Sequence, residues 1–149
     1  MLRPQNFKKN ADVLMHGILD KAQNELKSSS MKHSEEFLAI VNDAKERVRE
    51  VTVEETLQRM KSGAILIDVR EDREWSAGHA AEAVHLGRGI IERDIVEAYP
   101  EKTTEMILYC GGGFRSALSA DMLQKMGYTK VFSMAGGWKA WKEKGSPTE

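Results

Sequence analysis

The residues best suited to chemistry in this chain lie in one short run around its single cysteine, Cys110. An apolar stretch over residues 106–109 leads into Cys110, three glycines follow it, and the run closes on Arg115 and Ser116 before a helical pattern begins. A strand–loop–helix turn of this kind points several backbone N–H groups at one place, and such groups stabilise an anion. The only thiol of the chain therefore stands where its nucleophilic form, the thiolate, is favoured.

The three glycines decide how this cysteine is interpreted. A lone cysteine is most often a small buried hydrophobic residue. Glycine, however, is costly to order and is kept where the backbone takes a positive φ or approaches a ligand closely. A plain turn needs one or two glycines, whereas three followed by an arginine favour a cradle for an anion. With Cys110 as the nucleophile, the residues that we expect to form this cradle are Gly111, Gly112, Gly113, Phe114, Arg115 and Ser116.

Two chemistries use a cysteine in an anion cradle that ends in arginine, and loop length separates them. Cysteine phosphatases have a longer loop, with one residue more than the four that lie between Cys110 and Arg115. A shorter loop makes a tighter ring of N–H donors. Such a ring suits one charged sulfur atom better than the free oxygens of a phosphoryl group. The spacing therefore favours sulfur transfer, and phosphatase chemistry is the less favoured alternative.

Composition limits the class of protein. The chain has 149 residues, 41% hydrophobic and 30% charged, which fits one globular domain with or without an extension. Its net charge of -1 provides no electrostatic basis for binding nucleic acid or a membrane. No apolar run approaches the ~18 residues that span a bilayer, and the first residues lack the apolar core of a secretory signal. A single cysteine excludes an intrachain disulfide, so we expect a reducing, cytoplasmic location.

Apolar stretches alternate with helical patterns through most of the chain. Strands that are apolar on both faces and alternate with helices indicate an α/β fold, with a central parallel sheet flanked by helices on both faces. Ligands of such sheets bind beyond the carboxyl ends of the strands, where both Asp68 and Cys110 are expected. The predicted strands cover residues 64–69, 83–86, 106–109 and 130–133, and the predicted helices cover residues 34–49, 53–61, 71–75, 90–99, 115–126 and 138–144.

Capping residues and composition divide the chain. Ser34 is placed to cap the first of these helices, and Thr52 with Glu55 three residues later forms a capping box for the second. A serine run over residues 28–30 indicates a linker or the end of a helix, and the methionine that follows it is a candidate start. We therefore expect an N-terminal extension or pre-start segment over residues 1–32, a helix packing on the domain over 33–50, the domain itself over 51–145 and a tail over 146–149.

Together with two flanking motifs, the run at Cys110 resembles the active loop of the single-domain rhodaneses, which are sulfurtransferases. The loop pattern is Cys-x-x-Gly-x-Arg-Ser, from Cys110 to Ser116. Three ordered motifs at compatible spacing are far more specific than any one of them, and the resemblance covers about residues 50–145. The flanking motifs are Ile67-Asp68-Val69-Arg70-Glu71 with Glu74-Trp75 and Gly78-His79, and Ala135-Gly136-Gly137-Trp138 with Ala140-Trp141.

One short segment departs from the family's pattern. Family members commonly have Ile-Pro-Gly-Ala after the Gly-His pair, whereas this chain has Ala80-Ala81-Glu82-Ala83. The departure concerns the geometry of this corner and leaves the active loop unaffected.

The resemblance implies a rhodanese-like fold and a reaction that needs no cofactor. In the family, the loop cysteine takes a sulfane sulfur from an anionic donor such as thiosulfate, holds it as a persulfide, and passes it to a nucleophile. Because Cys110 has no second cysteine beside it, the acceptor must come from outside, as cyanide, a small thiol or a thioredoxin-like protein. The alternatives are a persulfide carrier that delivers sulfur to a partner protein and, less favoured, a catalytically silent interaction module.

Several charged residues allow two interpretations. Arg115 either neutralises the donor or fixes the loop by pairing with a buried carboxylate, for which Asp68 is the candidate. We expect Asp68 and Arg70 to support the loops rather than to react. Arg70, with Arg73 and Arg88, either adds positive potential for the donor or forms a solvated face. The scattered histidines favour structural roles over a general base and show no metal-ligand spacing, so no metal site is expected.

Overall fold

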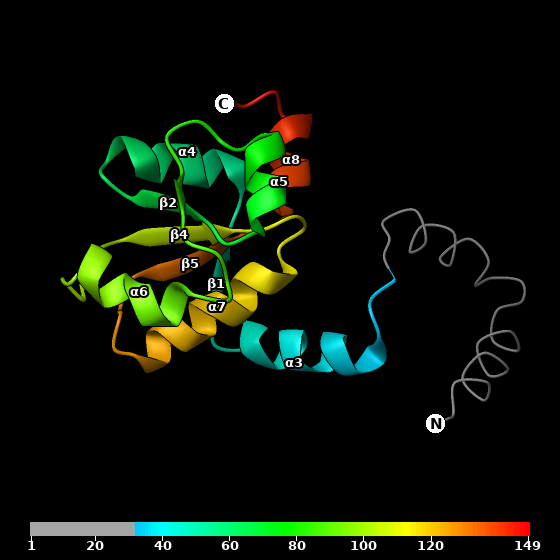
Figure 1. Ribbon diagram of the computed structural model, residues 1–149, viewed down its shortest axis with the longest axis vertical. Coiled ribbons are helices and arrows are strands. Elements are labelled where there is room, and N and C mark those ends of the chain that lie inside the picture. The colour runs from blue at the N-terminus through cyan, green and yellow to red at the C-terminus, as the bar shows by residue number, and fades with distance from the viewer. Residues whose placement is uncertain (1–31) are drawn as a thin grey trace, which may run out of the picture. The chain divides into compact units, whose positions relative to one another are not determined.

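A parallel sheet of five strands, in the order β1-β5-β4-β2-β3, forms the centre of the structure (Figure 1). The computed structural model describes residues 32–149. The predicted N-terminal extension, apart from Lys32, lies outside the described residues. Ala39–Glu149 form one compact unit. The strands are β1 (Arg49–Val51), β2 (Ile65–Asp68), β3 (Val84–His85), β4 (Met106–Tyr109) and β5 (Val131–Met134).

Helices alternate with these strands along the chain. The observed bounds agree with the predicted ones to within two residues, except at the end of the first helix. The helices are α3 (Glu35–Lys45), α4 (Val53–Lys61), α5 (Asp72–Ala77), α6 (Ile91–Ala98), α7 (Phe114–Lys125) and α8 (Gly137–Glu143).

The sheet buries apolar side chains on both of its faces. Successive residues of a strand point to opposite faces, so Leu108 of β4 joins the core beneath α6 and α7, while Ile107 joins the core beneath α4 and α8 (Figure 1). Every residue of β4 and of β5 is buried. This two-sided burial explains why the strands read as continuous apolar runs, and it confirms the predicted α/β class.

Helix α4 begins at the capping box that the sequence predicts. The hydroxyl of Thr52 accepts a hydrogen bond from the backbone N–H of Glu55 at 3.0 Å, and the N–H of Thr52 donates to the Glu55 carboxylate at 2.8 Å. Ser34 caps α3 in a similar way, since its hydroxyl accepts from the N–H of Phe37 at 3.0 Å. Local side-chain chemistry therefore sets both starts.

Strand β1 is the element that the sequence did not predict among the described residues. The helix expected over residues 34–49 ends at Lys45, and the chain then turns into β1, which pairs with β5 at the edge of the sheet. Val48 is buried and falls in phase with the helical apolar positions, which explains the overlong prediction. A three-residue edge strand with only Val51 buried has almost no alternation to detect.

The corner that departs from the family's pattern pairs with the C-terminal residues. The N–H of Ala81, at the position where the family commonly has proline, donates to the carbonyl of Pro147 at 3.0 Å. Glu82, where the family commonly has glycine, takes a φ of 67°. His79 and Glu149 exchange backbone hydrogen bonds of 3.0 and 2.8 Å. The residues predicted as a tail thus form a short antiparallel contact with this corner.

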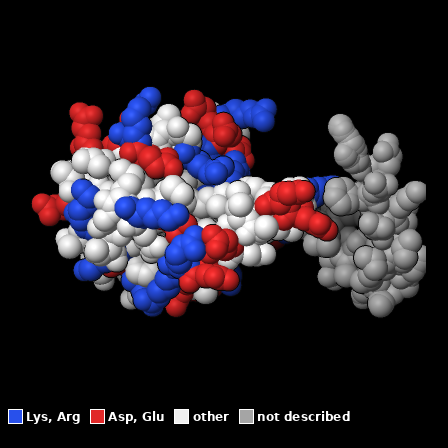
Figure 2. Space-filling view, turned by 90° about the horizontal axis from the view of Figure 1, so that it is seen from below, with Lys and Arg blue, Asp and Glu red and all other residues white. Residues whose placement is uncertain are grey.

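Surface charge and helix length agree with the composition. In the view from below, lysines and arginines mix with aspartates and glutamates over the described residues, and neither sign forms a large patch (Figure 2). Between residues 32 and 149, no helix is both long enough and apolar enough to cross a bilayer.

Candidate active site

The sulfur of Cys110 lies at the end of β4, inside a turn of backbone that leads into α7. Its Sγ accepts hydrogen bonds from the N–H groups of Gly113 at 3.2 Å and Ser116 at 3.3 Å. Only 1% of the residue is exposed. Helix α7 begins immediately after Gly113, so the positive end of its dipole adds to these two donors. The site can therefore hold a negative charge on sulfur.

Two serine hydroxyls extend the hydrogen bonding behind the sulfur. The Cys110 thiol donates to the Ser116 hydroxyl at 3.5 Å, and that hydroxyl shares a 2.8 Å hydrogen bond with the hydroxyl of Ser133 on β5. Both serines are fully buried. Sequence analysis did not identify Ser133, although a serine inside the apolar run of β5 is a signal that could have found it.

Helix α8 holds the loop from outside. The N–H groups of Trp138 and Lys139 donate to the carbonyls of Cys110 at 2.8 Å and Gly111 at 3.2 Å. Gly137 lies so close that a Cβ there would overlap the carbonyl oxygen of Cys110. Gly113 has a φ of 101°, which side chains disfavour, and it packs against the backbone of Gly136. The glycines of the loop and of the C-terminal motif therefore fit against each other.

Arg115 pairs with Glu74, not with Asp68 as the sequence suggested. Two hydrogen bonds, of 2.9 and 3.1 Å, join its guanidinium to the Glu74 carboxylate at the N-terminal part of α5. These bonds lower the pKa of Glu74 to about 2, so the carboxylate is ionised at neutral pH. The same pairing raises the pKa of Arg115. The guanidinium next to the cradle is thus already matched by one negative charge.

Asp68 is occupied by a nearer arginine. Its carboxylate accepts from the side chain of Arg70 at 2.8–3.1 Å and from the Arg70 backbone N–H at 2.8 Å. Arg70 also donates to the carbonyl of Gly78 at 2.7 Å, and its guanidinium lies 4.9 Å from the ring of Trp138. Asp68 and Arg70 thus connect the end of β2 with the corner before β3 and with α8.

The remaining candidates lie around the cradle without contacting the sulfur. The Phe114 ring lies 5.0 Å from the ammonium of Lys45. His79 stacks on Trp75 at 3.4 Å, and His85 stacks on the same ring at 4.8 Å. One ring nitrogen of each histidine lies at hydrogen-bond distance from a backbone carbonyl.

Comparison with known proteins adds two findings. A family model described as a rhodanese-like domain matches residues 52–144. The chain is also similar to a protein of unknown function from Rhodopseudomonas palustris CGA009, described as a possible tyrosine phosphatase. That similarity has 27% identity and a TM-score of 0.70, over 81% of this chain and 98% of the other.

Two further solved structures share the fold. One is the reduced CoADR-RHD protein of Bacillus anthracis, with 30% identity and a TM-score of 0.57 over 63% of this chain and only 16% of the other. The other is a rhodanese_3-like domain from Anabaena sp., with 26% identity and a TM-score of 0.54 over 58% of this chain and 99% of the other.

Proposed function

Because the chain belongs to the rhodanese-like domain family, we propose that it is a sulfurtransferase that carries a sulfane sulfur as a persulfide on Cys110. The observation that supports this most directly is the pair of backbone N–H groups, from Gly113 and Ser116, that donate to the buried Sγ. These donors can stabilise negative charge on Sγ during the reaction. A histidine base is not required, and the rings of His79 and His85 lie at hydrogen-bond distance from backbone carbonyls instead.

The proposed reaction has two steps, each a nucleophilic displacement at sulfur. With thiosulfate as donor, the Cys110 thiolate attacks the outer sulfur, a new S–S bond forms, and sulfite leaves with the electron pair of the broken bond. A nucleophile from outside then attacks the outer sulfur of the persulfide, and the electron pair returns to Sγ. Negative charge stays on sulfur in both steps, so the same N–H donors act throughout. One such donor in an oxyanion hole contributes ~2.7–4 kcal/mol.

Phosphatase chemistry is the second candidate, because the R. palustris protein is described as a possible tyrosine phosphatase. Two features of this chain weigh against it. The loop from Cys110 to Arg115 is short, as the sequence analysis noted. In addition, Arg115 is held by the ionised Glu74, so no uncompensated guanidinium meets a phosphate dianion. Cleavage of p-nitrophenyl phosphate that depends on Cys110 would reverse this preference.

Mass spectrometry of the intact protein tests the proposal. After incubation with thiosulfate, we expect one added sulfur, ~32 Da, that thiols remove and that Cys110→Ser does not acquire. Ser116→Ala should acquire the sulfur more slowly, because it loses the hydroxyl next to Sγ. Ser119→Ala is the matched control, since this buried serine lies on the same helix and its hydroxyl has no partner among the described residues. Absence of the adduct in the wild-type protein would contradict the proposal.

Discharge of the persulfide separates an enzyme from a carrier. Rapid turnover with cyanide or a small thiol supports the sulfurtransferase. A persulfide that forms but resists small acceptors supports delivery to a partner protein instead. Delivery to a partner protein, like a cytoplasmic location, stays a prediction of the sequence.

A further inference from the structure

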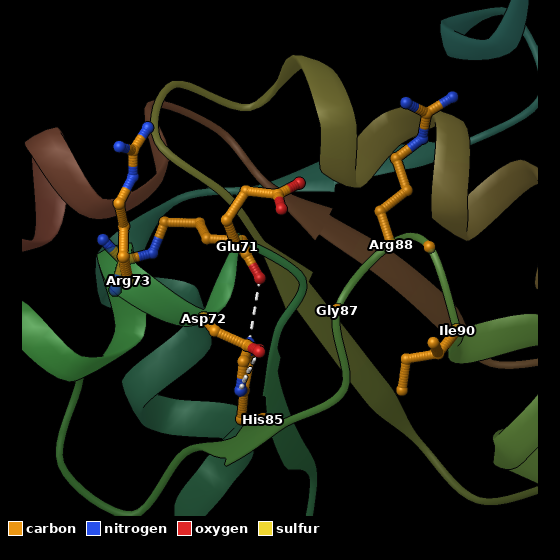
Figure 3. Close-up of a pocket in the computed structure, with 9 residues that line it drawn as sticks. Glu71, Asp72, Arg73, His85, Gly87, Arg88 and Ile90 are labelled. Carbon is orange, nitrogen blue, oxygen red and sulfur yellow. Dashed lines mark hydrogen bonds and ion pairs between the residues drawn. The ribbon is translucent and has the colours of Figure 1, made fainter.

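A cavity of about 540 Å³ opens between the segments that follow β2 and β3 (Figure 3). None of the loop residues from Cys110 to Ser116 lines it. Its walls come instead from the start of α5 and from the segment that leads into α6. The volume suits a small organic molecule. The persulfide chemistry proposed above does not yet use this space.

The cavity presents charges of both signs. Arg73 and Arg88 are exposed, and neither forms an ion pair within residues 32–149. In the close-up, the carboxylate of Glu71 lies between their guanidinium groups (Figure 3). Asp72 adds a second carboxylate, 3.8 Å from a ring nitrogen of His85. A purely anionic ligand would meet both carboxylates, whereas a ligand with carboxylate and ammonium groups finds a partner for each.

The cavity and Cys110 lie at the same edge of the sheet, where the parallel strands end. Asp68 of β2 lies in register with Tyr109 of β4, so the residues after each strand leave the sheet side by side. The N–H of Arg88 in turn donates to the carbonyl of Val69 at 2.9 Å, on the far side of β2. Neighbouring strands are ~4.8 Å apart, so about 10 Å separates the backbone at Arg88 from the end of β4 that leads into Cys110. That span is the length of an amino acid or a short peptide.

We propose that this cavity is the acceptor subsite and that it binds the zwitterionic part of a low-molecular-weight thiol of the amino-acid or small-peptide type. The inference rests on the proposed sulfurtransferase function. Carboxylates of the acceptor pair with Arg73 and Arg88, and its ammonium group pairs with Glu71. The acceptor thiolate attacks the outer sulfur of the Cys110 persulfide, the S–S bond to Sγ breaks, and the product leaves as the persulfide of the acceptor.

Acceptor selectivity tests this subsite. With saturating thiosulfate, kcat/KM is measured for glutathione and for 2-mercaptoethanol, which lacks charged groups. In Arg73→Gln and Arg88→Gln, we expect the ratio of the two values to fall by about fivefold or more, since each loses a charge-assisted contact with glutathione alone. Arg93→Gln is the matched control, because Arg93 is an exposed arginine on α6 that does not line the cavity. An unchanged ratio in both cavity variants would overturn the subsite.

Direct binding separates failure of the subsite from failure of the proposed function. S-methylglutathione cannot accept sulfur, so its titration by NMR reports binding alone. We expect shifts at residues 70–73 and 85–90, weakened in Arg88→Gln and absent with the diethyl ester, which lacks the carboxylates. If Cys110 acquires sulfur but S-methylglutathione does not bind, the subsite is wrong and the sulfurtransferase stands. If it binds but Cys110 takes no sulfur, the proposed function is wrong and the site remains.

Discussion

Two arginine–carboxylate pairs lie where β2 and β4 lead into the segments that follow them, and they differ mainly in burial. The side chains of Arg70 and Asp68 are 3% and 0% exposed, whereas those of Arg115 and Glu74 are 28% and 33% exposed. The ion-pair distances, 2.8 and 2.9 Å, are nearly the same. The same type of ion pair therefore serves two different roles, depending on how deeply it is buried. The first pair is part of the scaffold, and the second remains within reach of solvent and of a charged substrate.

The charge balance of each pair follows from its surroundings. Burial disfavours the charged form of Arg70, yet the hydrogen bonds and charge of Asp68 prevail and raise its pKa. At the exposed pair, the hydrogen bonds from Arg115 lower the pKa of Glu74 against a smaller effect of burial. Loss of one partner consequently leaves a buried, unmatched charge in the first case and a hydrated one in the second.

The largest expected effect comes from breaking the buried pair. Asp68→Asn leaves the Arg70 guanidinium charged and buried, and removing one partner of such a pair costs about 3–5 kcal/mol in the free energy of unfolding. Urea denaturation measures this cost. Asp94→Asn breaks a surface ion pair with Arg93 and should change the free energy of unfolding by less than about 1 kcal/mol. Equal losses of stability in the two variants would show that burial does not determine what an ion pair contributes to the fold.

The partly exposed pair of Arg115 and Glu74 should affect the KM for the sulfur donor more than it affects stability. Arg115→Gln leaves the ionised Glu74 beside the cradle without its partner, so a thiosulfate dianion is repelled. We expect the KM for thiosulfate to rise about tenfold, which is ~1.4 kcal/mol, with a stability change below about 1 kcal/mol. Steady-state kinetics and thermal unfolding provide the two readings. A large loss of stability with an unchanged KM would show that this pair, too, serves only the scaffold.

The complementary change should act in the opposite direction and more weakly. Glu74→Gln removes the negative charge that compensates Arg115, so we expect the KM for thiosulfate to fall by about threefold at low ionic strength. The effect should shrink as salt is added, because the pair is partly exposed. A double variant carrying Arg115→Gln as well should return toward the wild-type value. If it behaves like Arg115→Gln alone, the two residues do not act as a pair on the donor.

The smallest effect lies in the acid dependence of stability. The pKa of Glu74 is about 2 in the folded protein and 4.5 in the reference state. Because the folded value is the lower one, the contribution is complete above pH 4.5 and is lost as the pH falls toward 2. Partial exposure limits it to about 1 kcal/mol or less. Wild-type protein and Glu74→Gln should therefore converge in stability at low pH, and curves that stay parallel would contradict the assignment.

Sequence patterns predicted the sheet and the loop because both depend on local signals. Continuous apolar runs identified β2 and β4, and the glycines after Cys110 predicted a turn of backbone around the sulfur, in which the N–H groups of Gly113 and Ser116 donate to Sγ. Strand β1 was not predicted, because an edge strand of three residues is too short for its sequence to show an alternating pattern.

The choice of partner for Arg115 could not be predicted from the chain. Asp68, near the end of an apolar run, was the predicted partner, and Glu74 lies six residues further along the chain. Arg70, two residues from Asp68, takes that carboxylate through both its backbone and its side chain. Glu74 reaches Arg115 only because α5 folds back against the loop, which is a tertiary contact without a local signal.

The close fit of α8 against the loop has a consequence for how donor and acceptor approach the sulfur. Gly137 touches the backbone of Cys110, and the N–H groups of Trp138 and Lys139 donate to the carbonyls of Cys110 and Gly111, so α8 braces one side of the loop. The second sulfur must then be built on the side away from α8. Because the persulfide is a covalent intermediate, donor and acceptor react with Cys110 one after the other, and the kinetics should be of the ping-pong kind.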